Sequence, residues 1–135
     1  MLNIKLNNLS NVIALPYAAC SSKRKTMLHR SLVSSYHSIV EIPDRHVEDV
    51  MVQCITIDDI IDGLDLKRVN WIKIDVEGAE VDVLKGAERA LSMTHNMIIE
   101  VRPKNVISVL PTLKGKGFAI RKLGRGYFYA YRKEL

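Results

Sequence analysis

Two carboxylates follow an apolar run in the middle of the chain, and a glycine comes directly after them. The run at residues 70–74 contains a tryptophan and two isoleucines with a single lysine, which is typical of a buried strand. Asp75 and Glu77 follow it, and Gly78 permits a sharp turn. From Ala79 onward, apolar residues recur every three or four positions, which predicts a helix. Because ligands bind at the carboxyl ends of parallel strands, we expect Asp75 and Glu77 to line a site there.

A third carboxylate, Glu100, lies near the end of the next apolar run, residues 95–101. If that run is the neighbouring strand, Glu100 points into the same crevice. Three carboxylates on two strand ends can take a proton from a bound hydroxyl, or they can hold a divalent cation that prefers oxygen ligands. The alternative is that Glu77 and Glu80 only serve the amino end of the helix, and that Lys73 pairs with one of them.

The sequence WIKIDVEGAE at residues 71–80, followed by VLKGA at residues 83–87, resembles the signature of the FkbM family of S-adenosylmethionine-dependent methyltransferases. Residues 56–61 and 98–101 resemble the flanking family motifs, so the resemblance covers roughly residues 1 to 130. It implies an α/β fold with a Rossmann-like methyltransferase sheet that ends in an antiparallel hairpin. It also implies S-adenosylmethionine as cofactor and methyl transfer to a hydroxyl of a sugar, glycan or natural product.

The resemblance also suggests roles for individual residues. It places residues 11–15 as the third strand of the sheet, with Ala18 and Ala19 at its carboxyl end, where small side chains leave space for a flat adenine ring. The alternative is that these alanines only pack tightly at a turn. Asp75 is expected to contact the cofactor and, together with Glu77 and Glu100, to act on the acceptor, whose oxygen must align with the methyl carbon at about 3 Å.

A methyltransferase of this kind begins with a strand, a glycine-rich turn and an acid that binds the ribose. Here the first glycine is Gly63, and no GxGxG precedes the central strand. We therefore expect residues 1–135 to form a single partial domain, the carboxyl-terminal part, with an amino-terminally truncated sheet. The alternative is a non-catalytic remnant. Either form exposes strand edges, which a homodimer or a complementing amino-terminal fragment would cover.

Composition and cysteine usage indicate an ordinary soluble chain. Its 135 residues are 47% apolar and 26% charged, which allows one domain with a core. No apolar run approaches the roughly 18 residues that a membrane span needs, and the first ten residues contain no signal-peptide core. Cys20 and Cys54 have no paired spacing, so we expect free thiols in a reducing cytoplasm.

The net charge of +5 is concentrated at the carboxyl end. Residues 118–123 and 127–132 alternate basic with apolar side chains around Gly124 and Gly126, which predicts a hairpin with a solvated face. The alternative is a basic interaction module that binds RNA or anionic glycans. We favour the solvated face and do not expect a nucleic-acid partner, because the aromatic residues of the hairpin are expected to pack against the core and edge.

The region from residue 22 to residue 64 carries less information. Its histidines lack the spacing of a zinc site and are expected on the surface, although His29 or His37 is an alternative general base in a substrate lid. Residues 26–28 and 38–42 are candidates for short strands, and residues 52–57 for another. Asp58 is predicted to cap a short helix that runs to Leu64, so that Asp58 and Asp59 are structural.

Overall fold

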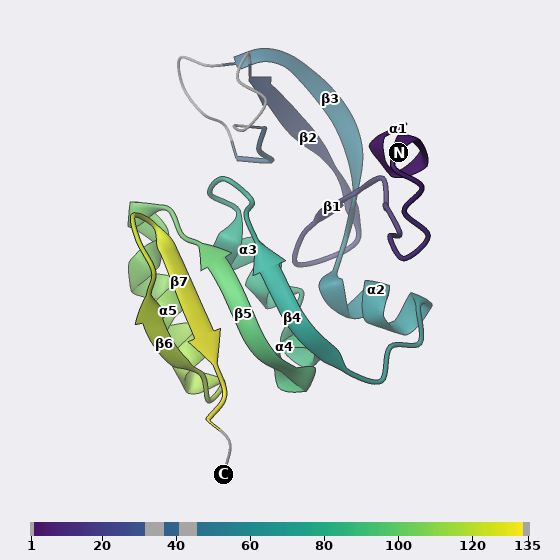
Figure 1. Ribbon diagram of the computed structural model, residues 1–135. Coiled ribbons are helices and arrows are strands. Elements are labelled where there is room, and N and C mark those ends of the chain that lie inside the picture. The colour runs from purple at the N-terminus through teal and green to yellow at the C-terminus, as the bar shows by residue number, and fades with distance from the viewer. Residues whose placement is uncertain (1, 32–36, 41–45, 134–135) are drawn as a thin grey trace.

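Two β-sheets and a layer of helices make up the protein in a computed structural model that describes residues 2–31, 37–40 and 46–133 (Figure 1). The helices are α1 (Leu2–Leu6), α2 (Ile57–Gly63), α3 (Glu80–Lys85), α4 (Glu88–Met93), η2 (Pro103–Asn105, a 3₁₀ turn) and α5 (Val106–Gly115). The strands are β1 (Tyr17–Ala19), β2 (Arg24–Ser31), β3 (His46–Ile55), β4 (Val69–Ile74), β5 (Thr94–Glu100), β6 (Ala119–Lys122) and β7 (Tyr127–Tyr131). Within these residues, no helix has the length and apolar character needed to cross a bilayer.

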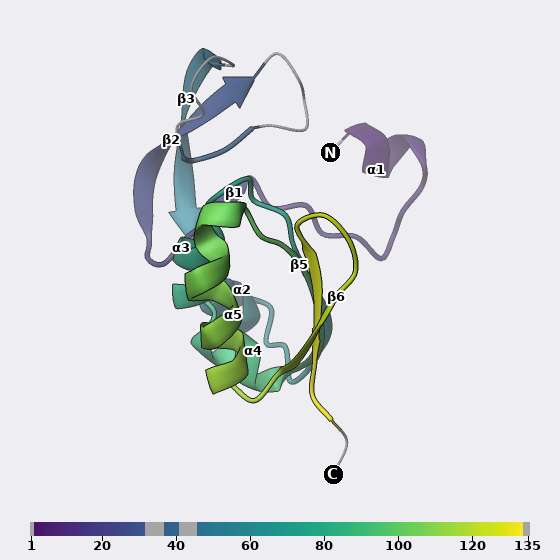
Figure 2. The same cartoon turned by 90° about the vertical axis from the view of Figure 1, so that its left-hand side faces the viewer.

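The larger sheet has the strand order β4-β5-β7-β6. β4 and β5 run parallel, whereas β7 is antiparallel to both β5 and β6. This confirms the expected antiparallel hairpin at the carboxyl end. Helices α3, α4 and α5 all lie on one face of this sheet (Figure 2). The buried core between them contains, among others, Ile74, Val83, Leu91, Met97, Ile99, Val109, Leu113, Phe128 and Ala130.

Alternation along the strands divides the larger sheet into two faces. In β7, Phe128 and Ala130 are buried against the helices, whereas the tyrosines between them are only half-buried. The face away from the helices carries a row of stacked rings, in which Tyr129 lies between Trp71 and Tyr131 with ring centroids 5.7 and 5.0 Å away. We call the side chains of Trp71, Tyr129 and Tyr131 the aromatic face.

β4 forms one edge of the larger sheet, so the strand that its apolar run predicts is buried on one face and exposed at this edge, as expected for a partial sheet. Its burial alternates, and Trp71 is 56% exposed. Strands of parallel sheets are ordinarily covered on both faces, which is why their sequences read as continuous apolar runs. In this structure β4 has the composition of a covered strand, but within the part of the chain that the structure describes it pairs with β5 alone.

The smaller sheet has the order β1-β3-β2, with β1 parallel and β2 antiparallel to β3. The expected strand at residues 11–15 is wrong, since the chain is irregular there and the first strand is β1. Ile13 is 68% exposed and its neighbours Val12 and Leu15 are also exposed, so the side chains of this apolar run are largely uncovered by the described residues. Ala18 and Ala19 therefore lie inside a strand, and their neighbours across the ladder are Cys54 and Ile55.

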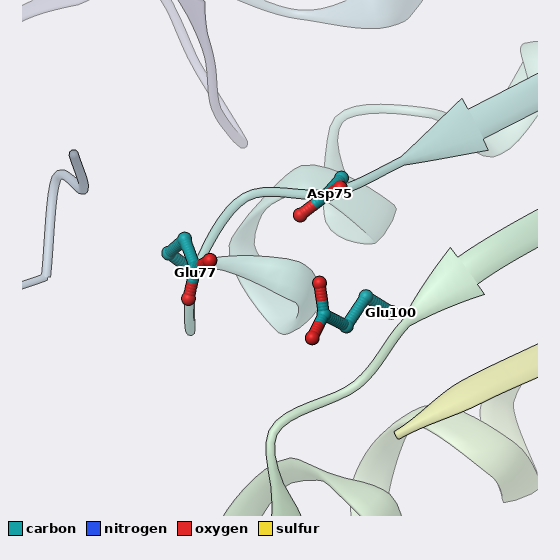
Figure 3. A group of neighbouring side chains, drawn as sticks. All are labelled: Asp75, Glu77 and Glu100. Atoms are coloured by element: carbon teal, nitrogen blue, oxygen red, sulfur yellow. The ribbon is translucent and has the colours of Figure 1, made fainter. Parts of the chain in front are cut away.

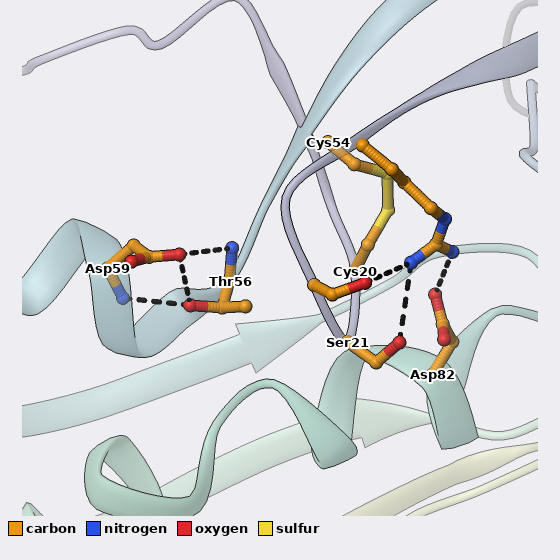
Figure 4. Close-up of a disulfide and its surroundings, with 8 residues drawn as sticks. Cys20, Ser21, Cys54, Thr56, Asp59 and Asp82 are labelled. Atoms are coloured by element: carbon orange, nitrogen blue, oxygen red, sulfur yellow. Dashed lines mark hydrogen bonds and ion pairs between the residues drawn. A yellow bond between two sulfur atoms is a disulfide. The ribbon is translucent and has the colours of Figure 1, made fainter.

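Cys20 and Cys54 form a disulfide, which corrects the expectation of two free thiols (Figure 4). They are 34 positions apart in the sequence, so their spacing gives no hint of pairing. The parallel register of β1 and β3 brings their Cα atoms to 5.7 Å, a separation typical of disulfides. Behind the disulfide, the backbone approaches Gly86 so closely that a Cβ there would lie 2.1 Å from the Cys20 carbonyl oxygen.

The acidic residues at the start of α2 are structural, as expected, but they act on two different helices. Thr56 is the N-cap of α2, and it exchanges hydrogen bonds with Asp59 in a capping box (Figure 4). Asp58 instead accepts hydrogen bonds from the backbone amides of Arg89 and Ala90, at 3.0 and 2.8 Å. The prediction that Asp58 caps its own helix is therefore wrong, because it caps the first turn of α4.

Candidate active site

The carboxylates of Asp75, Glu77 and Glu100 converge at the carboxyl ends of β4 and β5. The parallel register ends at Ile74 opposite Ile99, so Asp75 and Glu100 are the next residues on adjacent strands. An oxygen atom of each of the three side chains lies within 4.8 Å of the others. Figure 3 shows the three groups facing a common space in front of the strand ends. The structure thus brings together the three carboxylates that the sequence singles out.

Glu77 sits in a turn that few residues other than glycine adopt. Its φ is +49° and that of Gly78 is +106°. The Glu77 side chain is only 11% exposed, and its carboxylate forms an ion pair with the Arg102 guanidinium. This charge-assisted contact holds the Glu77 carboxylate in place.

Glu80 holds the same turn from the helix side. Its carboxylate accepts a hydrogen bond from the Gly78 amide at 2.7 Å and a second from the Asn105 side chain. Asn105 also donates to the Gly78 carbonyl at 2.9 Å. Glu80 is 1% exposed, and both of its carboxylate oxygens accept hydrogen bonds. The alternative that Glu80 serves the amino end of the helix is therefore confirmed. Lys73 forms its ion pair with Asp75, at 3.0 Å.

Glu100 is the carboxyl group of the site with a perturbed pKa. Burial raises the pKa of Glu100, and a hydrogen bond with Asp75 and the charges of Asp75 and Glu77 raise it further. The Tyr127 hydroxyl donates to Glu100, which opposes part of this shift and raises the pKa of Tyr127. Two carboxyl groups that share a hydrogen bond in this way can hold one proton between them.

Arg102 and Tyr127 are the site residues that the sequence analysis missed. Arg102 follows Glu100 by two positions, so a search for cations just beyond the strand end could have found it. Tyr127 lies directly opposite Glu100 in the ladder between β5 and β7. Its role could have been inferred only from the exact register of the hairpin, which the sequence does not fix.

The remaining candidate residues lie elsewhere. Ala18 and Ala19 are in the smaller sheet, beside an open hollow of about 320 Å³ that Tyr17, Lys23 and Gln53 line. Their expected contact with adenine stays a prediction. Among the histidines, His29 pairs with Asp49 at 2.7 Å across β2 and β3.

Several basic groups at the carboxyl end serve the fold. Arg132 donates to the carbonyls of Leu91 and Thr94, and its guanidinium lies 4.6 Å from the centre of the Phe118 ring. Lys116 forms an ion pair with Glu88. These contacts support the interpretation of the basic residues as parts of the hairpin and its surroundings.

The donor set of the site can be tested against the groups that the sequence implies. Oxygen ligands from Asp75, Glu77 and Glu100 suit a divalent cation in kind, but Lys73 and Arg102 already neutralise two of them. An array of carboxylates in a partly buried site also complements the positive sulfonium of S-adenosylmethionine. The site therefore fits the reactive end of the cofactor, and no residue here is assigned as a metal ligand.

Parallel strands that end in paired carboxylates, with helices on one side, define an α/β protein with an enzyme-like site at the strand ends. The methyltransferase FkbM domain family matches residues 1–120, and the chain belongs to this family. The recognition made from the sequence is thereby confirmed.

Two curated relatives are also methyltransferases. The chain is 33% identical over 67 residues to the hexuronic acid methyltransferase AglP of Haloferax volcanii, which covers 47% of this chain and 28% of the relative. It is 43% identical over 58 residues to methyltransferase 1 of Beauveria bassiana, which covers 41% of this chain and 23% of the relative. The matched segments thus span about a quarter of each relative. No solved structure matches the chain.

Proposed function

We propose that this protein takes part in the S-adenosylmethionine-dependent methylation of a hydroxyl oxygen on a sugar, glycan or natural product. The observation that carries the proposal is the convergence of Asp75, Glu77 and Glu100 at the ends of β4 and β5, in a chain that belongs to the FkbM methyltransferase family. The name of the Haloferax volcanii relative, a hexuronic acid methyltransferase, supports a sugar as the acceptor.

In this proposal the pair formed by Asp75 and Glu100 takes the proton of the acceptor hydroxyl. Methyl transfer is an in-line displacement, in which the new bond to oxygen forms as the bond to sulfur breaks. The hydroxyl becomes a better nucleophile as its proton passes to a nearby base. Glu100 has a raised pKa and a hydrogen bond to Asp75, so the pair can receive the proton while its second oxygens orient the acceptor.

Glu77 has a different role, because its carboxylate is already bound to Arg102. A carboxylate paired with a guanidinium is held in one orientation, which suits it to positioning a neighbouring group. We assign Glu77 to orienting the acceptor beside the positively charged methyl donor. S-adenosylmethionine, when bound, supplies the methyl group, and Asp75 is the residue best placed to contact both cofactor and acceptor.

The proposal includes a partner that covers the free edge of β4. Among residues 2–31, 37–40 and 46–133, β5 is the one hydrogen-bonded neighbour of this strand, and the exposed tryptophan of β4 belongs to the aromatic face. An unpaired strand edge beside exposed rings favours association with another chain. Either a second copy of the chain or an amino-terminal fragment that carries the glycine-rich cofactor turn would pair with this edge. Of the two, the amino-terminal fragment alone would also complete the cofactor site.

Calorimetry with S-adenosylmethionine tests the proposal in two stages. The purified 135-residue chain alone should bind the cofactor weakly or not at all. Fusion to the amino-terminal segment of the Haloferax volcanii relative should restore binding and methyl transfer to a uronic acid or another sugar hydroxyl. Micromolar binding by the chain alone would contradict the need for a partner. Cofactor binding by the fusion without transfer to any hydroxyl acceptor would support the non-catalytic alternative.

A further inference from the structure

The turn that carries Glu77 is held by side chains from distant parts of the chain. A non-glycine residue at positive φ is uncommon, and such a conformation persists only where its surroundings hold it. Arg102, Asn105 and Glu80 hold the turn from the carboxyl-terminal side. A further contact comes from the opposite direction in the sequence, some forty positions earlier.

That contact is made by Ser38. Its hydroxyl donates to the Glu77 carbonyl at 2.9 Å and accepts from the Val40 amide at 3.0 Å. Ser38 is 3% exposed, which is unusual for a serine outside the regular strands and helices. A backbone bridge to His29 fixes it on β2. The Ser38 hydroxyl therefore links the segment 37–40, which is bridged to β2, to the turn of the candidate site.

Packing around Ser38 supports a docked arrangement. Ile39 and Val40 pack against the hydrophobic core, and Val40 lies beside Gly78, 3.9 Å from where a Cβ would stand there. The described segment 37–40 thus rests on the same two residues, Glu77 and Gly78, that have positive φ. A single hydroxyl at this point can bias the conformation of the turn, because a buried carbonyl without a partner is unfavourable.

We propose that Ser38 is a positioning residue, which holds the turn at Glu77 and Gly78 in its positive-φ conformation and so aims the Glu77 carboxylate into the site. The functional meaning of this inference depends on the proposed role of Glu77 in methyl transfer. The physical link from Ser38 to the turn does not depend on it. Through Ser38, a change in the position of the described segment 37–40 would change the geometry of the acceptor side of the site.

The experiment is nuclear magnetic resonance on the full 135-residue chain. Positive φ shortens the distance between the amide and α protons of one residue, so Glu77 should give a strong intraresidue Overhauser effect. Ser38→Ala should weaken that signal and speed amide exchange at Gly78 by about 10-fold or more, because the turn opens more often. Ser38→Thr, which keeps the hydroxyl, should restore both signals.

A matched control is Ser92→Ala, which removes a similar hydroxyl-to-carbonyl bond, 2.7 Å long, in α4. It should leave the Glu77 signals unchanged. If Ser38→Ala lowers the melting temperature but leaves the Glu77 and Gly78 signals as in the wild type, the role of Ser38 is only structural and the proposal is overturned. A methyl-transfer assay that fails would not alter this readout, so the two proposals can fail separately.

A double-mutant cycle covers the case in which Ser38→Ala does not fold. Glycine adopts positive φ without strain, so Glu77→Gly should reduce the contribution that the Ser38 hydrogen bond makes to the stability of the turn. Loss of Ser38 should therefore cost less stability in the Glu77→Gly background than in the wild type, as measured by urea unfolding. An equal cost in both backgrounds, or no recovery of folding in the double variant, would contradict the proposal.

Discussion

Glu100 shares a hydrogen bond with Asp75 across the ends of two parallel strands, and burial raises the pKa of Glu100 above that of an ordinary carboxyl group. The folded protein therefore keeps the Glu100 proton to a higher pH than the unfolded chain does. The stability that this group contributes is fully present below the ordinary pKa of glutamate and is lost as the pH rises through the raised pKa.

The first prediction concerns the pH dependence of stability. The glutamine side chain of Glu100→Gln is uncharged at every pH. This variant therefore does not lose stability as the pH rises through the raised pKa of Glu100. The variant should gain melting temperature relative to the wild type as the pH is raised from about 4 to about 8. Thermal unfolding at several pH values measures the difference between the two proteins. A difference that is independent of pH would show that Glu100 titrates as an ordinary exposed glutamate.

The second prediction concerns catalysis by the reconstituted enzyme. Asp75→Ala should lower the rate of methyl transfer by about 100-fold or more, because a positioned proton acceptor is lost. Asp62→Ala is the matched control, since it removes an exposed aspartate from a surface ion pair with Arg89 in another part of the chain. Transfer of a labelled methyl group to a sugar acceptor is the measurement. Full activity of Asp75→Ala would exclude Asp75 from the mechanism.

The third prediction concerns the disulfide. Closing a loop between Cys20 and Cys54 restricts the unfolded chain, and a loop of this length gives about 3–4 kcal/mol. Reduction, or the double variant Cys20→Ser/Cys54→Ser, should lower the free energy of unfolding by that amount. Thiol titration of denatured, unreduced protein should detect no free cysteine, and urea unfolding gives the energy. Two free thiols in protein purified without reductant would contradict the pairing.

The fourth prediction concerns the cap of α4. Asp58→Ala leaves the backbone amides of Arg89 and Ala90 without their acceptor, which should cost about 1–2 kcal/mol of stability. Glu48→Ala is the control, because it removes an exposed carboxylate paired with Arg30 and should cost much less. Urea unfolding of both variants decides between them. Equal losses of stability in the two variants would mean that the cap of α4 contributes no more than an exposed ion pair.

The fifth prediction concerns the free edge of β4. Trp71 is the single tryptophan of the chain, so its fluorescence reports directly on this edge. Association with a second copy or with an amino-terminal fragment should shift its emission to shorter wavelength as the ring loses water. Trp71→Lys should weaken that association by about 10-fold or more, measured by light scattering, because charge opposes edge pairing. Association without change in the fluorescence would place the partner elsewhere.

The sequence predicts the part of the fold that depends on local pattern and short connections. The positions of Asp75, Glu77 and Glu100 follow from two apolar runs that end in carboxylates, and the carboxyl-terminal hairpin follows from alternation around two glycines. These patterns are sufficient because strand ends and tight turns leave few alternatives. The convergence of the three acids is therefore predictable before any coordinates.

Contacts between distant segments are not predictable in this way. The disulfide depends on the register of β1 against β3, and the cap of α4 by Asp58 joins residues some thirty positions apart. The expected strand at residues 11–15 is absent because propensity alone cannot supply a neighbour. The expectation of a cytoplasmic location rests partly on unpaired cysteines, which the disulfide does not support, and the compartment stays a prediction.

The close approach at Gly86 brings the backbone of Cys20, next to β1, against the connection between α3 and α4. The carbonyl oxygen of Cys20 occupies the space that a Cβ would need, and the Gly86 carbonyl accepts a hydrogen bond from the Asp58 amide at 3.1 Å. These main-chain contacts, together with the ion pair between Arg24 and Asp82, thus set the spacing between the disulfide-bearing sheet and the helices behind the carboxylates. Position 86 therefore tolerates almost no substitution, because even the Cβ of alanine would push the backbone at Cys20 away from the connection between α3 and α4.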